Sequence, residues 1–190
     1  IMHHAGCDYI ASRGEYLNSK LLAAYLDFPF IDAEDCIFFD DAGKLDSEKT
    51  EKELSQVLSL HEYAVIPGFY GILPNGMIKT FSRGGSDITG SIVAGAVRAD
   101  LYENWTDVSG MLMADPRYID NPRPIAEITY RELRELSYMG ATVMHDEAIF
   151  PVRKARIPIN IRNTNDPKAP GTMIVSKAAS NLVDTVITGI

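Results

Sequence analysis

The sequence predicts an α/β fold in which helices cover both faces of a mainly parallel sheet. Short apolar runs such as residues 36–39 and 63–66 end in turn residues, as buried parallel strands do. Segments with the apolar spacing of helices lie between such runs, and this alternation is typical of parallel βαβ units. The 190 residues, 46% hydrophobic and 23% charged, suit one globular domain without internal repeats.

Each element has its own signal. Residues 14–28 predict a helix because Leu17, Leu21, Leu22 and Tyr25 form one apolar stripe. Thr129 and Glu132 have the spacing of a capping box, which predicts a helix start. The other expected helices cover 47–60, the small-residue part of 81–97, and 146–154, and the expected strands cover 36–39, 63–66, 77–81, 98–105, 157–161 and 172–175.

Composition excludes several classes of function. The net charge of −8 argues against nucleic acid as a partner, because phosphate backbones need a basic surface. No apolar run approaches the roughly 20 residues that span a bilayer, so no membrane association is expected. Cys7 and Cys36 form neither a disulfide framework nor a metal-ligand pattern, which favours a reducing, cytoplasmic setting. The four histidines show no metal-binding spacing either.

The segment 81–87, F-S-R-G-G-S-D, carries the strongest functional signal. Unpaired backbone N–H groups at a helix start attract anions, and Gly84 and Gly85 allow a ligand close to the backbone. Arg83 adds a planar guanidinium that can hold a carboxylate or phosphate through two hydrogen bonds. An ordinary glycine-rich turn capped by Ser86 is the alternative interpretation.

Two further groups could handle charged ligands. Asp107, Asp115 and Arg117 lie in one loop, and Glu15 could receive an ammonium group. Glu15 could equally be a solvated first-turn charge, and Asp115 before Pro116 could simply begin a turn. Ligands bind beyond the carboxyl ends of parallel strands, so we expect residues 67–71, 83–87 and 106–117 to share a binding cleft.

The usual nucleotide and nucleophile motifs are missing from the sequence. It has no G-x-x-x-x-G-K-[ST], no G-x-G-x-x-G after a strand and no G-x-S-x-G. The anion-handling groups suit phosphoryl transfer, where catalysis consists largely of positioning and charge neutralisation.

Several motifs, taken in order, resemble the aspartate kinase family. This resemblance implies the three-layer α/β/α sandwich of amino acid kinases. It also implies transfer of the ATP γ-phosphoryl group to the side-chain carboxylate of L-aspartate, giving 4-phospho-L-aspartate. That reaction is the first step toward lysine, threonine and methionine. The motifs are S-R-G-E (12–15), F-S-R-G-G-S-D-I-T (81–89), W-T-D-V-x-G-x-x-x-A-D-P-R (105–117), M-G-A-T-V-M-H (139–145) and P-x-N-I-R-N-T (158–164).

The resemblance also implies residue roles. Glu15 matches the carboxylate that receives the α-ammonium group of aspartate, and Arg83 matches the arginine that binds its α-carboxylate. Asp87 matches an aspartate near the transferred phosphoryl group, which organises a cation or a catalytic lysine. By the same resemblance, Mg²⁺ is carried by the nucleotide and takes no ligands from the chain. The implied substrate-binding residues are Glu15, Arg83, Gly84, Gly85 and Ser86, and the implied catalytic residues are Arg83 and Asp87. The implied nucleotide-binding residues are Thr106, Asp107, Leu112, Met113, Ala114, Asp115, Pro116, Arg117 and Thr142.

The chain departs from the family pattern at three places. The K-F-G-G-[ST] element is absent, Thr142 stands where many relatives have a lysine, and Leu112 replaces a tyrosine. We therefore expect residues 1–180 to be the C-terminal larger part of a catalytic domain that is inactive alone. Residues 181–190 would begin a linker to an ACT-type regulatory domain, in a homodimer or higher oligomer. The alternatives are another amino-acid-kinase-fold enzyme acting on a different carboxylate or a nucleotide, and a non-catalytic regulatory relative.

Overall fold

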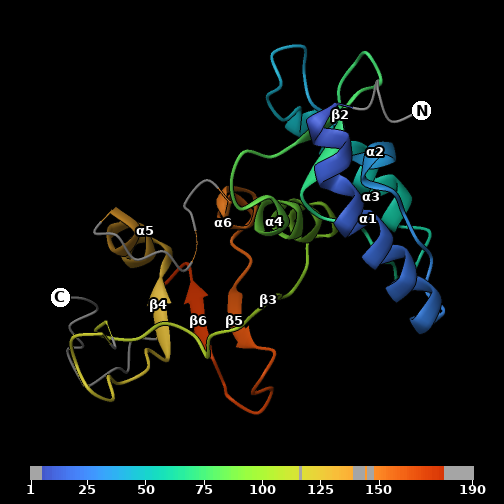
Figure 1. The fold of residues 1–190 in the computed structure, drawn as a ribbon. Coiled ribbons are helices and arrows are strands. Elements are labelled where there is room, and N and C mark those ends of the chain that lie inside the picture. The colour runs from blue at the N-terminus through green and yellow to red at the C-terminus, as the bar shows by residue number, and fades with distance from the viewer. Residues whose placement is uncertain (1–5, 116, 139–143, 145–147, 178–190) are drawn as a thin grey trace. The chain divides into compact units, whose positions relative to one another are not determined.

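The computed structural model describes residues 6–115, 117–138, 144 and 148–177. The chain forms two compact units, Ile1–Val97 and Arg98–Ile190. Each unit combines helices with strands (Figure 1), so the α/β class is confirmed.

The first unit is built from a helical layer and a short hairpin. Strands β1 and β2 pair antiparallel, with Tyr70 opposite Thr80. Helix α3 packs on α4, α2 packs on β1, and α1 packs on β2. The elements are α1 (Cys7–Leu26), α2 (Ala33–Cys36), α3 (Ser47–Leu58), β1 (Tyr70–Ile72), β2 (Ile78–Thr80) and α4 (Gly85–Val97).

Two predicted strands of this unit are reduced to isolated bridges. Residues 36–39 contribute a parallel bridge from Phe38 to Ile72 and an antiparallel one from Phe39 to Leu45, and residues 63–66 contribute a parallel one from Val65 to Phe30. Part of the first run is taken by α2, because Asp32 caps that helix through the N–H of Glu34. The apolar character of both runs still serves the core, where Ile37 is fully buried.

Helix α1 differs from its prediction in length and in burial. It begins at Cys7 and continues through Gly14, seven residues earlier than the predicted start. The apolar stripe of Leu17, Leu21 and Tyr25 is 63%, 71% and 84% exposed. The stripe was recognised correctly, but in this structure it faces solvent.

The second unit is a four-stranded sheet with two helices (Figure 1). The strand order is β3-β5-β6-β4, in which β3 with β5 and β4 with β6 are parallel and β5 with β6 is antiparallel. The predicted capping box is confirmed, since Glu132 accepts the N–H of Thr129 at 2.7 Å. The elements are β3 (Tyr102–Thr106), β4 (Glu127–Thr129), α5 (Tyr130–Tyr138), α6 (Phe150–Ala155), β5 (Ile159–Asn163) and β6 (Thr172–Val175).

The core of the second unit lies between the sheet and its helices. Ile128, Leu133, Val152, Ile159 and Ile174 are almost wholly buried. Within the described ranges, no helix has the length and apolar character needed to cross a membrane.

The two cysteines should react differently with a thiol reagent. Cys36 is completely buried, and burial, reinforced by Asp35 and Asp32, raises the pKa of its thiol to about 12. Cys7 is exposed. Iodoacetamide at pH 8 should label the peptide containing Cys7 and leave Cys36 unlabelled until the protein is denatured, as read by mass spectrometry. Equal native labelling of both would contradict the burial of Cys36.

The ion pair between Asp8 and Lys79 should stabilise the first unit only above acidic pH. Partial burial raises the pKa of Asp8, but hydrogen bonds from Thr80 and Lys79 outweigh this, so the pKa lies below its ordinary value of 3.8. Asp8→Asn should lower the free energy of unfolding by less than about 1 kcal/mol at neutral pH. The difference from wild type should persist above about pH 4 and vanish as the pH falls further, because protonation then removes the same charge.

Urea unfolding between pH 2 and 7 measures this dependence. Asp41→Asn, which changes an exposed aspartate, is the control and should leave stability unaltered. A constant difference between Asp8→Asn and wild type at every pH would show that the charge of Asp8 does not matter.

Candidate active site

The first turn of α4 presents the predicted anion-binding groups. Gly84 has φ +55° and accepts the N–H of Ile88, so the helix starts directly after it. Arg83 is exposed, and no hydrogen bond or ion pair with another described residue engages its guanidinium. Ser86 is exposed and Asp87 half-buried in the same turn. The guanidinium of Arg83, which has no partner among the described residues, thus lies beside the N–H groups at the start of the helix. This arrangement binds a carboxylate or phosphate.

A strained turn packs on this helix start. Phe69 has φ +81°, a conformation that costs a non-glycine residue about 1–3 kcal/mol. A Cβ on Gly85 would lie 2.8 Å from the Phe69 ring, and a Cβ on Gly68 would lie 3.2 Å from Cα of Ser86. A side chain at Gly85 would therefore force a shift of the Phe69 turn, and one at Gly68 would crowd Ser86, so both glycines favour the close approach.

Glu15 lies on α1 and is half-buried. Two residues earlier, Arg13 lies over the rings of Tyr9, Tyr16 and Tyr70, at 4.3, 4.4 and 5.4 Å from their centroids. The structure therefore connects the helix of Glu15 to Tyr70, the residue after Phe69. It shows no direct contact between Glu15 and Arg83.

Tyr70 is held in place by burial and by a hydrogen bond. It is fully buried, and its hydroxyl donates a 2.6 Å hydrogen bond to Asp32. Burial, followed by the bond to Asp32, raises the pKa of Tyr70 well above its ordinary value, so the phenol remains a donor.

The predicted nucleotide-binding residues belong to the second unit. Thr106 ends β3, and its carbonyl accepts both the N–H and the hydroxyl of Thr164, at 2.8 and 2.9 Å. Asp107 is exposed and accepts a hydrogen bond from the Thr106 hydroxyl. The loop then pairs with a later segment through a bridge between Leu112 and Pro124. Met113 and Ala114 follow in this loop, whereas Pro116 and Thr142 lie outside the described residues.

Asp115 and Arg117 bind each other. The Arg117 Nε donates to both carboxylate oxygens at 3.0 and 2.9 Å, and the backbone N–H of Arg117 donates at 2.8 Å. The side-chain hydrogen bonds from Arg117 hold the pKa of Asp115 below its ordinary value. Asp115 thus orients an arginine two residues later in the chain.

Thr172 anchors the loop between Met111 and Ile125, a role that no local sequence pattern predicts. It is fully buried, accepts the N–H of Met111 at 2.8 Å and donates to the carbonyl of Ile125 at 2.6 Å. Gly110 has φ +100°, and a Cβ there would collide with the Thr172 hydroxyl. Gly110 and Thr172 together hold both ends of the loop against β6.

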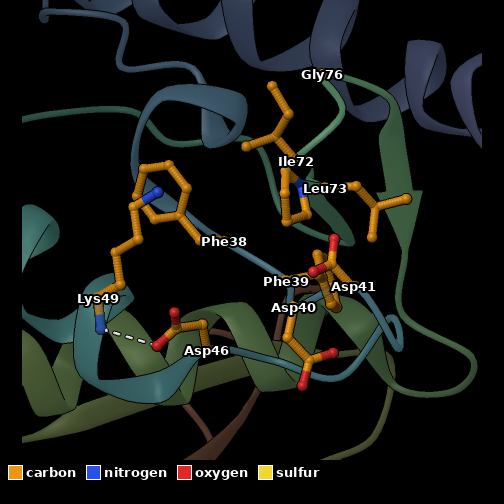
Figure 2. A pocket seen from close by; sticks show the side chains of 10 residues that line it. Phe38, Phe39, Asp40, Asp41, Asp46, Lys49, Ile72, Leu73 and Gly76 are labelled. Atoms are coloured by element: carbon orange, nitrogen blue, oxygen red, sulfur yellow. Dashed lines mark hydrogen bonds between the residues drawn. The ribbon is translucent and has the colours of Figure 1, made fainter.

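A hollow of about 440 Å³ lies on the first unit, apart from any predicted site residue (Figure 2). Phe38, Ile72 and Leu73 give it apolar walls, and Asp40 and Asp46 line it with carboxylates. Asp46 accepts the backbone N–H of Lys49 as the cap of α3, so this carboxylate already has a structural role. Over the part of the chain that the structure describes, no three His, Cys, Asp or Glu side chains gather as a metal-binding group.

The comparisons with known proteins identify the class. Residues 2–163 match the model of the amino acid kinase family, so the chain belongs to that family.

Its relatives within the family include aspartokinases. The chain is 44% identical over 179 residues to aspartokinase 3 of Bacillus subtilis, in an alignment that covers 90% of this chain and 39% of that protein. It is 30% identical over 197 residues to chloroplastic aspartokinase 1 of Arabidopsis thaliana, covering 96% and 34%. The chain thus spans about two fifths of the length of these relatives.

Solved structures agree with this classification. The crystal structure of Clostridium acetobutylicum aspartate kinase superposes with a TM-score of 0.90 at 58% identity, covering 96% of this chain and 42% of that chain. Escherichia coli aspartokinase III, solved in complex with aspartate and ADP, gives a TM-score of 0.82 at 28% identity, covering 91% and 41%. The uridylate kinase of Archaeoglobus fulgidus shares the fold, with a TM-score of 0.61 at 22% identity. That superposition covers 89% of this chain and 72% of the uridylate kinase chain. The amino-acid-kinase fold expected from the sequence is confirmed.

Loss of the Thr172 hydroxyl should destabilise the protein. Thr172→Val keeps the shape of the side chain but leaves a buried N–H and a buried carbonyl without partners, which costs roughly 1–3 kcal/mol. Urea unfolding should show this loss, and hydrogen exchange should be faster at Met111. Thr172→Ser, which retains the hydroxyl, is the control. Wild-type stability of the valine variant would mean that the loop is held by other contacts.

Proposed function

We propose that the protein to which this chain belongs is an aspartate kinase. The reaction transfers the γ-phosphoryl group of ATP to the side-chain carboxylate of L-aspartate, giving ADP and 4-phospho-L-aspartate. The observation that carries the proposal is the first turn of α4, where the uncommitted guanidinium of Arg83 stands beside helix N–H groups. The aspartokinase relatives support the choice of aspartate as the acceptor.

Aspartate binding uses residues of the first unit. Arg83 holds the α-carboxylate through two hydrogen bonds, supported by the N–H groups of Gly84, Gly85 and Ser86. Glu15, half-buried on α1, receives the α-ammonium group. The side-chain carboxylate is already ionised at neutral pH, so it attacks the γ-phosphorus without a general base. Positioning and charge neutralisation then lower the barrier.

ATP binding uses residues of the second unit. Thr106 and Asp107 at the end of β3 and the loop 112–117, which includes Arg117, contact the nucleotide. Thr142 belongs to the same proposed set. Mg²⁺ enters with the nucleotide, where its charge offsets that of the phosphates, and Asp87 orients cationic groups near the transferred phosphoryl. The carboxylate of Asp87 suits this role because its negative charge attracts cationic groups such as a lysine ammonium.

The biological setting follows from the same proposal. Aspartate phosphorylation would be the first step toward lysine, threonine and methionine. A reducing, cytoplasmic setting, an oligomeric assembly and a following regulatory domain stay predictions.

Kinetics of the full-length protein test the role of Arg83. Arg83→Ala should raise the aspartate KM by about 30- to 150-fold, the effect of losing hydrogen bonds to a charged group, and should leave the ATP KM nearly unchanged. The aspartate KM of Arg83→Lys should lie between those of the wild type and Arg83→Ala, because lysine keeps the charge and loses the planar pair of donors. Arg131→Ala, at an exposed arginine on α5, is the control.

Two outcomes would contradict the proposal in different ways. An unaltered aspartate KM in Arg83→Ala removes this residue from the site. If the wild type is tested on a panel that includes aspartate and phosphorylates another carboxylate or a nucleotide instead, that compound and not aspartate is the substrate.

A further inference from the structure

Thr89, to which no catalytic role is assigned, makes two hydrogen bonds through its side-chain hydroxyl. It lies one turn into α4 and is 4% exposed. Its hydroxyl accepts the N–H of Phe69 at 3.1 Å and donates to the carbonyl of Gly85 at 2.8 Å. One hydroxyl therefore joins the strained turn to the first turn of the helix.

The bond to Phe69 falls where the backbone needs support. Phe69 is in the left-handed region at φ +81°, which a phenylalanine adopts only when surrounding contacts impose it. Its carbonyl accepts the N–H of Phe81 at 2.9 Å, and its N–H is held by Thr89. Both polar groups of this residue are thus fixed by the segment that leads into α4.

The same turn extends the connection to the other half of the aspartate site. Tyr70 follows Phe69, is fully buried, and lies beneath the guanidinium of Arg13 on α1. Glu15 is two residues further along that helix. A continuous series of contacts therefore runs from the start of α4, through Thr89, Phe69, Tyr70 and Arg13, to the helix of Glu15.

We propose that Thr89 is a positioning residue for aspartate: its hydroxyl sets the spacing between the Phe69 turn and the start of α4, and thereby the geometry of the groups that hold the amino acid. The inference rests on the proposed function, because it assigns aspartate to Arg83 and Glu15. Without the hydroxyl, the Phe69 N–H lacks its partner, and the turn can relax away from Gly85. Arg83 then holds its ligand in a poorer geometry, while the nucleotide residues of the second unit keep theirs.

The test compares Thr89→Val with a matched substitution in the full-length protein. Thr50 is also fully buried in a helix of the first unit, and its hydroxyl accepts the N–H of Phe38 at 3.0 Å. Thr50→Val therefore removes the same kind of bond outside the proposed site. Thr89→Val should raise the aspartate KM by about three- to tenfold, with kcat and the ATP KM nearly unchanged. Thr50→Val should lower the melting temperature without that KM change.

Two further variants keep the test decisive. Thr89→Ser retains the hydroxyl and should restore the wild-type aspartate KM. Should the valine variant be insoluble, Thr89→Ala, which suits a helix better, should give the same rise in KM. Hydrogen exchange of the peptide 67–72 should be faster in the variants without the hydroxyl, and unchanged in Thr50→Val.

The outcomes separate the two proposals. A wild-type protein that does not phosphorylate aspartate overturns the proposed function. An active wild type whose aspartate KM is the same in Thr89→Val, or a serine variant that behaves like the valine variant, overturns the positioning role alone. Unchanged exchange at Phe69 in Thr89→Val would overturn it as well.

Discussion

The close approach of a backbone turn to the start of α4 is the constraint on which the proposed aspartate site depends. A Cβ on Gly85 would lie 2.8 Å from the Phe69 ring and force a shift, and a Cβ on Gly68 would crowd Ser86 at 3.2 Å. The approach also requires the left-handed conformation of Phe69. Strain of this kind is concentrated at functional sites, which supports the proposed placement of the ligand at this helix start.

Buried polar contacts of one type support both halves of the chain. In the first unit Thr89 holds the N–H of Phe69, and in the second unit Thr172 holds the N–H of Met111. Each threonine lies in a regular element, and each accepts from a loop with a positive φ nearby. A hydroxyl that is rigidly placed by a helix or strand can fix a loop more accurately than the loop's own contacts do. In both units a regular element thus fixes the position of a neighbouring loop.

Local signals in the sequence predicted some parts of this arrangement and could not predict others. The capping box of Thr129 and Glu132 and the glycine-rich start of α4 depend on neighbouring residues only, and both were found at their predicted places. The early start of α1 and the exposure of Leu17 depend on what packs against the helix, which spacing does not show. The hydroxyl of Thr89 joins residues 20 positions apart, so no local pattern could reveal its partner.

The two predicted arginines differ in a way that bears on ligand choice. The Arg83 guanidinium has no protein partner within the described ranges, so an incoming carboxylate has only water to replace. Arg117 is already bound by Asp115, whose lowered pKa keeps it ionised. An anion that approaches Arg117 must compete with this carboxylate or share the guanidinium with it. A phosphate chain carries more charge than a single carboxylate and competes better, so this difference supports the proposed assignment of the nucleotide to loop 112–117 and of the aspartate carboxylate to Arg83.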